Sequence, residues 1–230
     1  VAAGGDNLSI AYQQPDGTFS AQTIAISDGV ANSPSWSICG GDLDGNGFND
    51  LLFAGGGGAS FIWANADGTA YNETSDGNYI FCQRSNLVDM DADGNLDAFV
   101  CHDVAPNVWY MNNGTQNFDW NQGGLGDTPD GGNYGSVWID YDNDCDIDMF
   151  IAKCRGGDSP ANINQMHRNN GDGTFTEVGE EIGLADNVQT WSSAWADYDN
   201  DGDMDVVVGA SSNANGMHKV MMNDGTGMFT

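Results

Sequence analysis

The chain has 230 residues, of which 34 are acidic and only 5 are basic, so that its formal net charge is −29. A surface this negative repels the phosphates of nucleic acids and of anionic membranes, which excludes both as favourable partners. Hydrophobic residues make up 40% and aromatic residues 10% of the chain, which excludes a disordered acidic tail and predicts one folded domain with a substantial core.

The first 26 residues predict a hairpin. Asp16-Gly17 stands between two apolar segments, and a tight turn needs residues that tolerate a positive φ. We interpret residues 1–26 as the second, third and fourth strands of a unit whose first strand and acidic loop are missing. Residues 1–5 carry no export signal, so any such signal is expected to have been removed or to lie outside the chain.

A pattern of four strands then recurs four times. Each unit has a short strand, an acidic loop of nine residues, an apolar strand and a hairpin with Asp-Gly or Asn-Gly at its turn, and the loops are residues 42–50, 89–97, 140–148 and 197–205. Four antiparallel strands in about 50 residues are typical of a β-propeller blade. We predict an all-β propeller domain over residues 1–230, with blades at about 1–30 (partial), 31–78, 79–125, 126–182 and 183–230.

The four loops hold half of the 34 acidic residues, whereas a solvated acidic surface would spread its charge. Oxygen ligands at loop positions 1, 3 and 5, followed by a turn-forming glycine at position 6, match the first half of an EF-hand calcium loop. The closing carboxylate comes at position 9, however, and an apolar strand follows in place of a helix. The pattern therefore predicts calcium loops between strands, with the backbone carbonyl of position 7 completing each set of ligands.

The predicted metal ligands occupy the same five positions in every loop. They are Asp42, Asp44, Asn46, Phe48 and Asp50; Asp89, Asp91, Asp93, Asn95 and Asp97; Asp140, Asp142, Asp144, Asp146 and Asp148; and Asp197, Asp199, Asp201, Asp203 and Asp205. About four Ca²⁺ ions would relieve the repulsion and couple metal binding to folding. Mg²⁺ fits less well because it prefers few carboxylates, and acidic turns without metal are the other alternative. Cys145 stands where glycine is expected, so its turn is expected to be strained or held in another way.

The Asp-x-Asp-x-Asp-Gly-x-x-Asp loops, the apolar strands after them and the Asp-Gly-Thr-Phe hairpin at 172–175 resemble the FG-GAP or VCBS repeats of integrin α-subunit propellers and secreted bacterial proteins. Residues 140–156 are similar to the cartilage acidic protein group and its bacterial relatives. The resemblance implies a calcium-binding propeller, usually of seven blades, so the five units are expected to be part of a larger one. A closed ring of five units is the alternative.

The five cysteines suggest disulfides. Cys82 and Cys101 bracket the second loop with its two strands, and Cys145 and Cys154 flank the strand that leaves the third loop. Each pair is predicted to come within the Cα separation that a disulfide needs, in keeping with an oxidising extracellular compartment. Cys39 would then pair with a residue in blades outside the chain. Five free thiols are the alternative.

Few residues suggest catalysis. The three histidines fall in different blades without a nucleophile motif, so we expect structural or surface roles for His102, His167 and His218. Three tryptophans on strands that precede the loops are expected to fill the space between blades: Trp36, Trp138 and Trp195. On the face opposite the acidic loops, Arg155 is the candidate ligand contact, because its guanidinium could hold a carboxylate of a partner. An ion pair within the chain is the alternative role of Arg155.

These observations favour a non-enzymatic, secreted or cell-surface calcium-binding propeller that serves adhesion or binds a protein or carbohydrate. Its expected partners are that ligand and the remaining blades or domains of a larger polypeptide. One alternative is a propeller-type carbohydrate-active enzyme, similar to polysaccharide lyases, which would need a deep pocket with basic and histidine groups. The other is a structural assembly unit of a surface layer or filament, which would show large subunit contacts.

Overall fold

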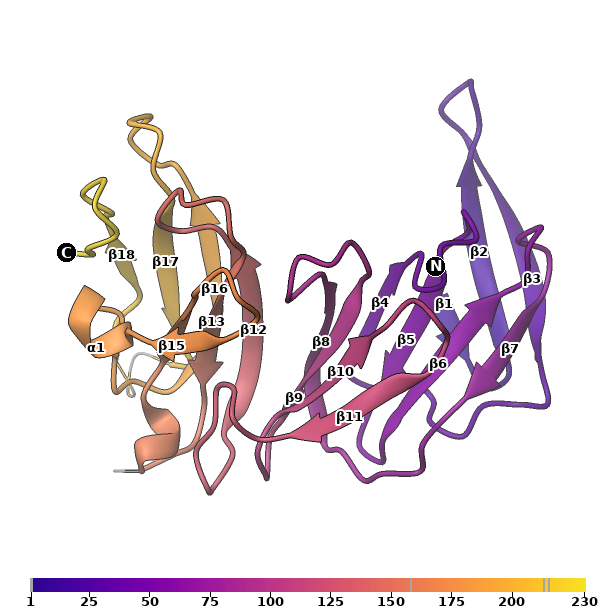
Figure 1. Ribbon diagram of the computed structural model, residues 1–230, viewed down its shortest axis with the longest axis horizontal. Helices are drawn as coiled ribbons and strands as arrows, with labels where there is room; N and C mark the ends of the chain where they lie inside the picture. The colour runs from indigo at the N-terminus through magenta and orange to yellow at the C-terminus, as the bar shows by residue number, and fades with distance from the viewer. Residues whose placement is uncertain (1, 158, 213, 215) are drawn as a thin grey trace.

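The computed structural model is an all-β protein made of small antiparallel sheets (Figure 1), and it describes residues 2–157, 159–212, 214 and 216–230. The strands are β1 (Ala2–Gly4), β2 (Asn7–Gln13), β3 (Phe19–Ser27), β4 (Ser37–Gly41), β5 (Asp50–Ala54), β6 (Ala59–Ala64), β7 (Tyr71–Thr74), β8 (Cys82–Val88), β9 (Asp97–His102), β10 (Val108–Asn112), β11 (Phe118–Gln122), β12 (Asn133–Ile139), β13 (Asp148–Lys153), β14 (Gln165–Asn169), β15 (Phe175–Glu177), β16 (Thr190–Ala196), β17 (Asp205–Ala210) and β18 (Lys219–Met221). A 3₁₀ helix at Pro160–Asn162 and the short helix α1 (Gly179–Ile182) complete the described elements. Neither has the length and apolarity to cross a membrane.

Consecutive strands pair with one another in each sheet. We call β4–β7 the first sheet, β8–β11 the second, β12–β15 the third and β16–β18 the fourth. In the fourth sheet the chain turns back after β18, and Asn223 forms an antiparallel bridge with Phe229. The first strands of successive sheets, β4, β8, β12 and β16, adjoin one another. The predicted all-β class with small antiparallel sheets is thus confirmed.

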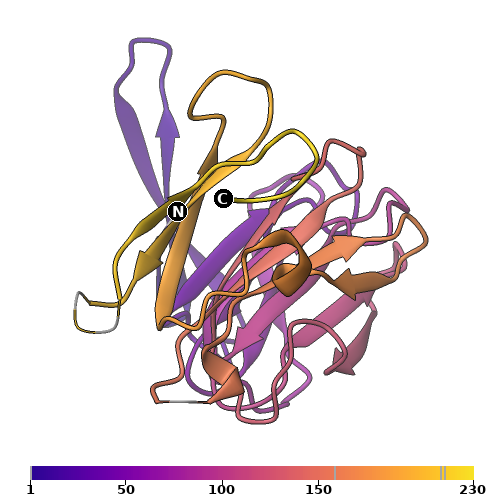
Figure 2. The same ribbon diagram turned by 90° about the vertical axis from the view of Figure 1, so that its left-hand side faces the viewer.

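The sheets follow one another along the long axis of the molecule, and Figure 2 views them from the end at which the fourth sheet lies. Buried apolar clusters fill each junction. Leu52 and Ala54 of β5 contribute to the cluster shared with the second sheet, whereas Leu51 and Phe53 contribute to the cluster with β2 and β3. Because both faces of β5 are covered, all five of its residues are buried. The same holds for β9 and β13, which explains their continuous apolar sequences.

Two of the three tryptophans predicted to lie between sheets do so. Trp138 meets Phe99 of the second sheet with ring centroids 5.4 Å apart, and Trp195 meets Phe150 of the third sheet at 5.6 Å. The prediction is wrong for Trp36, which precedes β4 and is 58% exposed. Its strand begins at Ser37, two residues later than the predicted start at Ser35, so the indole is outside the ladder.

The N-terminal hairpin is not a sheet of its own. Strand β3 pairs in parallel with β7, so β1–β3 extend the first sheet to seven strands. The hairpin also covers part of the first sheet, because Leu8, Ile24 and Ile26 pack with Phe53. This arrangement pairs two strand edges that would otherwise be open.

The predicted disulfides are wrong, because all five cysteines are free thiols. Cys82 and Cys101 lie on the neighbouring strands β8 and β9, but they belong to different apolar clusters. A register shift between Cys82 and Arg84 places Cys82 opposite His102 and not opposite Cys101. The two thiols therefore point to opposite sides of the second sheet, where burial raises the pKa of each.

The second predicted pair is separated along one strand. Cys145 lies in the third loop and Cys154 follows the far end of β13. A six-residue strand is about 20 Å long, whereas a disulfide requires Cα atoms about 4.4–6.8 Å apart. The segment between these two cysteines therefore holds them apart.

Candidate metal centres and ligand pocket

Four clusters of carboxylates lie in the loops that join the first and second strands of the four sheets. In each cluster, oxygens from loop positions 1, 3 and 9 lie within 4.8 Å of one another: Asp42, Asp44 and Asp50; Asp89, Asp91 and Asp97; Asp140, Asp142 and Asp148; and Asp197, Asp199 and Asp205. The structure thus brings together three of the five predicted positions in every loop. These clusters could hold metal ions.

The aspartate at position 9 is the first residue of the strand after the loop and is fully buried in all four cases. In the second loop, Asp97 Oδ2 accepts the N–H of Met90 at 2.8 Å, and its Oδ1 accepts the N–H of Asn112 at 2.7 Å. Asp50, Asp148 and Asp205 make the same two kinds of contact. Through these two hydrogen bonds, the carboxylate at position 9 connects its loop to the end of the third strand.

Burial makes these carboxylates hard to ionise without a counter-charge. Loss of hydration raises the pKa of Asp97 to about 6 and that of Asp148 to about 7, and it also raises the pKa of Asp50. Backbone N–H donors oppose this shift, while the other carboxylates of the loop add to it. A cation among the three carboxylates would favour their ionised forms.

The aspartate at position 1 closes the turn of each loop. Asp89 Oδ1 accepts the N–H of Asp93 at 3.1 Å, and its Oδ2 accepts that of Gly94 at 2.9 Å. The turn requires a left-handed backbone at position 6, where φ is +92° at Gly94 and +76° at Cys145. Cys145 is therefore strained, as its place in the pattern predicted, and its loop is held by the same contacts from Asp140.

The residues at position 5 turn toward the backbone of their own loop. Asp93 Oδ1, Asp144 Oδ1 and Asp201 Oδ1 each accept the N–H of position 7, and Asn46 Oδ1 does the same. The carboxylates of Asp93, Asp144 and Asp201 do not join the clusters of positions 1, 3 and 9. Metal ligation by position 5, and by the position 7 carbonyls of Phe48, Asn95, Asp146 and Asp203, stays a prediction.

The residues present fit a divalent cation. Each cluster offers only oxygen donors, and Asp142 Oδ1 is buried without a hydrogen-bond partner among the described residues. An unpaired buried carboxylate oxygen is unfavourable, and a hard cation would satisfy it. The carboxylates at positions 1, 3 and 9 would hold the ion, and the ion would supply the charge that neutralises them.

A feature that the sequence analysis missed joins each of the first three acidic loops to the next sheet. The third strands of the second, third and fourth sheets are followed or ended by an asparagine whose side chain reaches back. Asn112 Nδ2 donates to the Leu43 carbonyl at 2.7 Å, Asn223 Nδ2 to the Tyr141 carbonyl at 2.9 Å, and Asn169 Nδ2 to the Met90 carbonyl at 3.4 Å. We call these contacts the asparagine links. Their sequence signal is an Asn that ends the apolar strand before each later hairpin turn.

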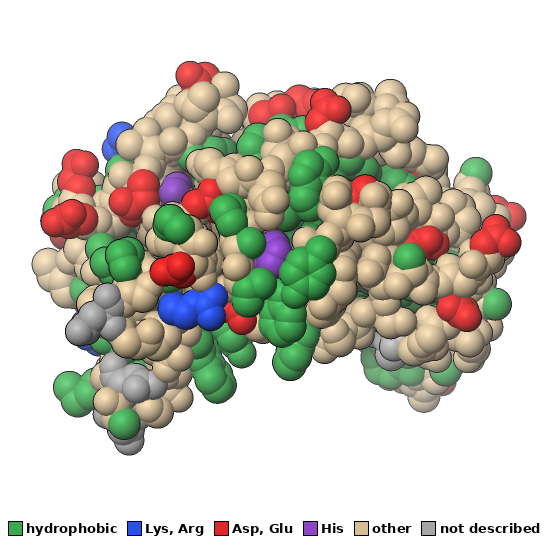
Figure 3. All heavy atoms as spheres, turned by 90° about the horizontal axis from the view of Figure 1, so that it is seen from below, with side chains coloured by type: hydrophobic (Ala, Val, Ile, Leu, Met, Phe, Trp, Pro, Cys, Tyr) green, Lys and Arg blue, Asp and Glu red, His purple; other side chains and the backbone are tan. Residues whose placement is uncertain are grey.

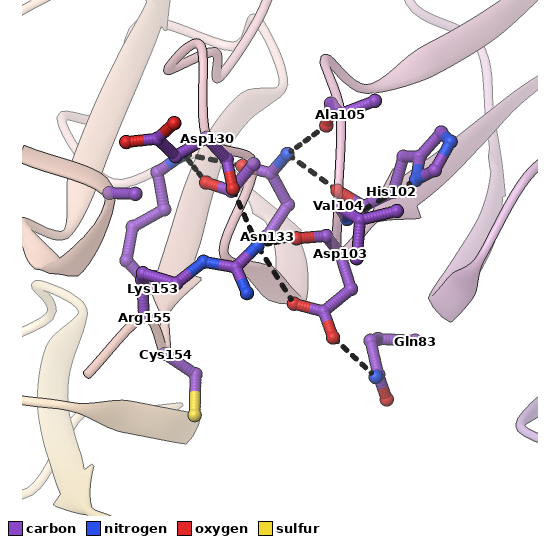
Figure 4. A network of polar contacts seen from close by, with 12 residues as sticks. Gln83, His102, Asp103, Val104, Ala105, Asp130, Asn133, Lys153, Cys154 and Arg155 are labelled. Carbon is purple, nitrogen blue, oxygen red and sulfur yellow. Dashed lines mark hydrogen bonds and ion pairs between the residues drawn. The ribbon is translucent and has the colours of Figure 1, made fainter.

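Arg155, the predicted ligand contact, is used within the chain (Figure 4). Its Nη2 donates to the carbonyls of Asp103 at 2.6 Å and Asp130 at 2.5 Å, and it lies 3.9 Å from the Asp103 carboxylate. Gln83 Nε2 donates to the other oxygen of that carboxylate at 3.1 Å. Figure 3 shows basic side chains beside acidic ones and a hydrophobic patch on this side of the molecule. The guanidinium thus links the second and third sheets, in line with the ion-pair alternative.

Lys153 lies beneath this network and is fully buried. Its Nζ donates to the Gly126 carbonyl at 2.9 Å and to Asn133 Oδ1. Burial lowers the pKa of Lys153 to about 8, although the charge of Asp127 opposes the shift. His102 and His167 are also buried, and burial lowers the pKa of each, to about 4 for His167. These groups are within the protein and do not line a described pocket.

A pocket of about 260 Å³ opens between the second and third sheets. It is lined by Met90, Asp91, Trp109, Met111, Gly124, Leu125, Gly173, Thr174 and Phe175. Trp109 Nε1 donates to the Gly123 carbonyl at 3.1 Å, which fixes the indole at the wall. The lining thus combines aromatic residues with an aspartate and a threonine. A wider groove of about 820 Å³ lies between the β2–β3 hairpin and the first sheet, where Tyr12, Ile38 and Phe48 are exposed.

Comparison with known proteins agrees with the repeat pattern. No curated protein sequence matches the chain significantly. A solved lectin of Agrocybe aegerita, described as recognising non-reducing terminal N-acetylglucosamine, is similar in fold, with a TM-score of 0.58 and 18% sequence identity. The match covers 96% of this chain and 59% of that chain, so the chain spans less than two thirds of the lectin's length. The FG-GAP-like repeat family matches residues 140–208, and the predicted resemblance to that family is confirmed over this segment.

Proposed function

We propose that the chain is a calcium-binding, propeller-like recognition module that binds a carbohydrate through the pocket between the second and third sheets. In this proposal the predicted units are blades of a larger propeller, the module is extracellular, and it acts by binding without catalysing a reaction. The observation that carries the proposal is the pocket itself. Trp109 and Phe175 line a space whose wall also includes Asp91.

The chemistry of the pocket suits a sugar ring. Sugars present C–H groups on one side, which pack on aromatic rings, and hydroxyl groups on the edges, which donate to carboxylates. The pocket volume of about 260 Å³ is just below the range of about 300–1,000 Å³ for drug-sized ligands, which suits a short saccharide end. None of the described residues that line the pocket is basic or a histidine, which supports binding over catalysis. The lectin similarity supports the same ligand class.

Calcium would act as a brace for this pocket. Asp91 belongs both to the second carboxylate cluster and to the pocket wall, and Met90 beside it also lines the pocket. An ion held by Asp89, Asp91 and Asp97 would fix the position of this wall. Sugar binding is therefore expected to depend on calcium even if the ion does not contact the sugar.

A glycan array probed with and without Ca²⁺, followed by calorimetry on each glycan found, tests the proposal. We expect binding that falls at least about tenfold in Trp109→Ala, because stacking on the indole is lost. Trp36→Ala is the matched control, since Trp36 is exposed and does not line the pocket, and it should bind as the parent does. Binding to no glycan, or equal binding by the Trp109→Ala variant, would rule out this function. Turnover of a bound glycan would favour the enzymatic alternative.

A further inference from the structure

A groove of about 440 Å³ lies between β8 and β12, the adjoining first strands of the second and third sheets (Figure 1). It shares no lining residue with the carbohydrate pocket described above. Three lining residues alternate along β8, and they are Arg84, Asn86 and Val88. The opposite wall includes Ser136 and Trp138 of β12 and Ile147 of the third acidic loop.

The charge in this groove is opposite in sign to that of the whole chain. None of its lining residues is acidic, although acidic residues outnumber basic ones by 34 to 5 in the sequence. Its one charged lining residue, Arg84, is exposed and forms no ion pair within the described part of the chain, whereas Arg155 and Lys219 each do. The guanidinium of Arg84 is therefore available to an anion from outside the chain, and its planar N–H donors match the two oxygens of a carboxylate.

Asn86 places a second donor on the same side of β8. Its Oδ1 accepts a hydrogen bond from the Ser136 hydroxyl, and Cys101 Sγ donates to that hydroxyl oxygen at 3.3 Å. These contacts fix the carboxamide with its oxygen toward β12. Asn86 Nδ2 donates to no acceptor among the described residues, so its two N–H groups are available beside Arg84.

The two donors depart from the repeat. By the ladder register, Arg84 pairs with Cys101 and Asn86 with Phe99, which are four and two residues after Asp97. The corresponding residues of the other three sheets are all small or apolar, and they are Ser37 and Cys39, Gly135 and Val137, and Ser192 and Ala194. The same first strand therefore forms three times without a cation at this position. Because the fold does not require Arg84, a role in binding accounts for it better than a role in packing.

Trp138 gives the groove a fixed apolar wall. Its indole meets the rings of Phe99 and Phe175 nearly at right angles, with centroids 5.4 and 6.0 Å away. Val88 lies on the facing strand, four residues from Arg84, which is about 13 Å along the strand. The groove thus has a cationic end at Arg84 and an apolar end near the acidic loops.

We infer that this groove binds a small organic acid, whose carboxylate is held by Arg84 and Asn86 and whose ring packs on Trp138. A carboxylate bears a single charge, so the acidic chain repels it less than it repels a doubly charged phosphate ester. The volume of about 440 Å³ lies within the range of about 300–1,000 Å³ for small-molecule sites. A sugar acid and an aromatic acid share this chemistry. The inference does not rest on the proposed carbohydrate binding, because the two sites have different residues.

Calorimetric titration of the full chain with glucuronate and with benzoate, in one Ca²⁺ buffer, tests the inference. We expect an acid that binds the parent chain to bind at least about tenfold more weakly to Arg84→Ala, because the charge-assisted pair is lost. Arg84→Lys should lose less, since it keeps the charge but not the planar donors. Asn86→Asp should also lose binding, because it keeps the acceptor for Ser136 but replaces the amide donor with a negative charge.

Arg168→Ala is the matched control. Arg168 is also exposed and forms no ion pair among the described residues, but it does not line the groove, so this variant should bind as the parent does. Glucose and benzamide lack the carboxylate and should bind at least about tenfold more weakly than glucuronate and benzoate. Trp109→Ala should bind the acid unchanged, which separates this site from the carbohydrate pocket.

The titrations can also overturn the inference. Binding of neither acid to the parent chain would do so, as would equal affinities of the parent and Arg84→Ala for an acid. Tighter binding of glucose 6-phosphate than of glucuronate would contradict the choice of a carboxylate. Where binding depends on Arg84, tighter binding of glucuronate assigns the site to sugar acids, and tighter binding of benzoate assigns it to aromatic acids.

Discussion

At the scale of single residues, Cys145 is the one loop residue at position 6 that is not glycine. Its φ of +76° lies in the left-handed region, which L side chains adopt at a cost of about 1–2 kcal/mol. We predict that Cys145→Gly raises the free energy of unfolding by about 1 kcal/mol, the relief of strain exceeding the extra entropy of the unfolded chain. Urea unfolding in excess chelator measures this without a contribution from metal.

The reciprocal change is the matched control for this prediction. Gly94 has a φ of +92°, and a Cβ added there would meet no atom within 4 Å. Gly94→Cys should therefore destabilise the protein by about 1–2 kcal/mol through the backbone alone. Equal stability of Cys145→Gly and the parent chain would show that the strain at Cys145 does not exceed the entropy that glycine adds to the unfolded chain.

We predict that the buried His167 makes the free energy of unfolding depend on pH. Burial lowers its pKa from an ordinary value of 6.5 to about 4, and its Nε2 has no partner among the described residues. The unfolded chain therefore takes up a proton between these values while the folded protein does not. The contribution of His167 is complete above pH 6.5 and is lost as the pH falls toward 4, by about 3 kcal/mol in all.

A comparison with His167→Met isolates this effect, because Met221 occupies the corresponding place in the fourth sheet. Urea unfolding in chelator is measured at several values between pH 7 and pH 4. As the pH falls, the free energy of unfolding of the variant should rise relative to that of the parent chain. A difference in stability that is independent of pH would mean that His167 has the same pKa in the folded and the unfolded protein.

A substitution at Asp97 tests the role of the aspartate at position 9 of each loop. Asp97→Asn keeps the shape but replaces one acceptor of a backbone N–H with a donor, and it removes one charge from the cluster. We expect a loss of about 1–3 kcal/mol in chelator and a larger loss with Ca²⁺ present, as followed by thermal melts. The exposed Asp119→Asn should change neither value. Equal losses with and without Ca²⁺ would contradict metal binding by Asp97.

At the scale of elements, the asparagine links connect each sheet to the acidic loop before it. Asn112 is buried, and its side chain donates to the carbonyls of both Leu43 and Leu96. We predict that Asn112→Ala destabilises the protein by about 1–3 kcal/mol, because the carbonyls of Leu43 and Leu96 lose their donor. The control is Asn113→Ala, at the neighbouring exposed residue. Urea unfolding compares the stabilities of the two variants.

The same variant reports on coupling between loops. Loss of the Asn112 link should weaken Ca²⁺ binding at the first loop, which contains Leu43, as well as at the second. Calorimetric titration of Ca²⁺ would show two weakened sites. Four unchanged sites would mean that the link stabilises the junction without affecting the metal centres.

The local structure of each acidic loop could be predicted from the sequence. The Asp loops have local hydrogen bonds that recur whenever the pattern recurs, so the convergence of positions 1, 3 and 9 followed from spacing. The asparagine links join residues that are about 70–80 positions apart, such as Asn112 and Leu43, and no local pattern defines such a distance. The disulfide prediction was wrong for a related reason. Proximity along the chain did not reveal on which side of β8 and β9 each thiol lies.

At the scale of the whole molecule, metal and fold are expected to be coupled in four places. Chelation would leave three close carboxylates in each loop without a counter-ion. We predict that excess chelator lowers the melting temperature markedly and that excess Ca²⁺ restores it, because an ion that binds only the folded state stabilises it. Differential scanning calorimetry checks this. An unchanged melt in chelator would mean that the loops are acidic turns without metal.

The succession of sheets was predictable because its signal is a repeat of about 50 residues. Apolar strands with both faces covered follow from runs such as Leu51–Ala54. The place of residues 1–30 was not predictable in this way. Its parallel contact with β7 depends on which strand edges remain open after folding, and that is a property of the assembled molecule.

The asparagine links have a consequence for how such a protein changes over generations. Each link needs only one side chain from a unit and one carbonyl from the unit before it, so the second, third and fourth sheets each carry their own link. Duplication or deletion of one complete unit that carries such an asparagine leaves every remaining junction between these units with both the donor and the acceptor of its link. Proteins built in this way are expected to lengthen and shorten by whole units, and insertions of other sizes to be selected against.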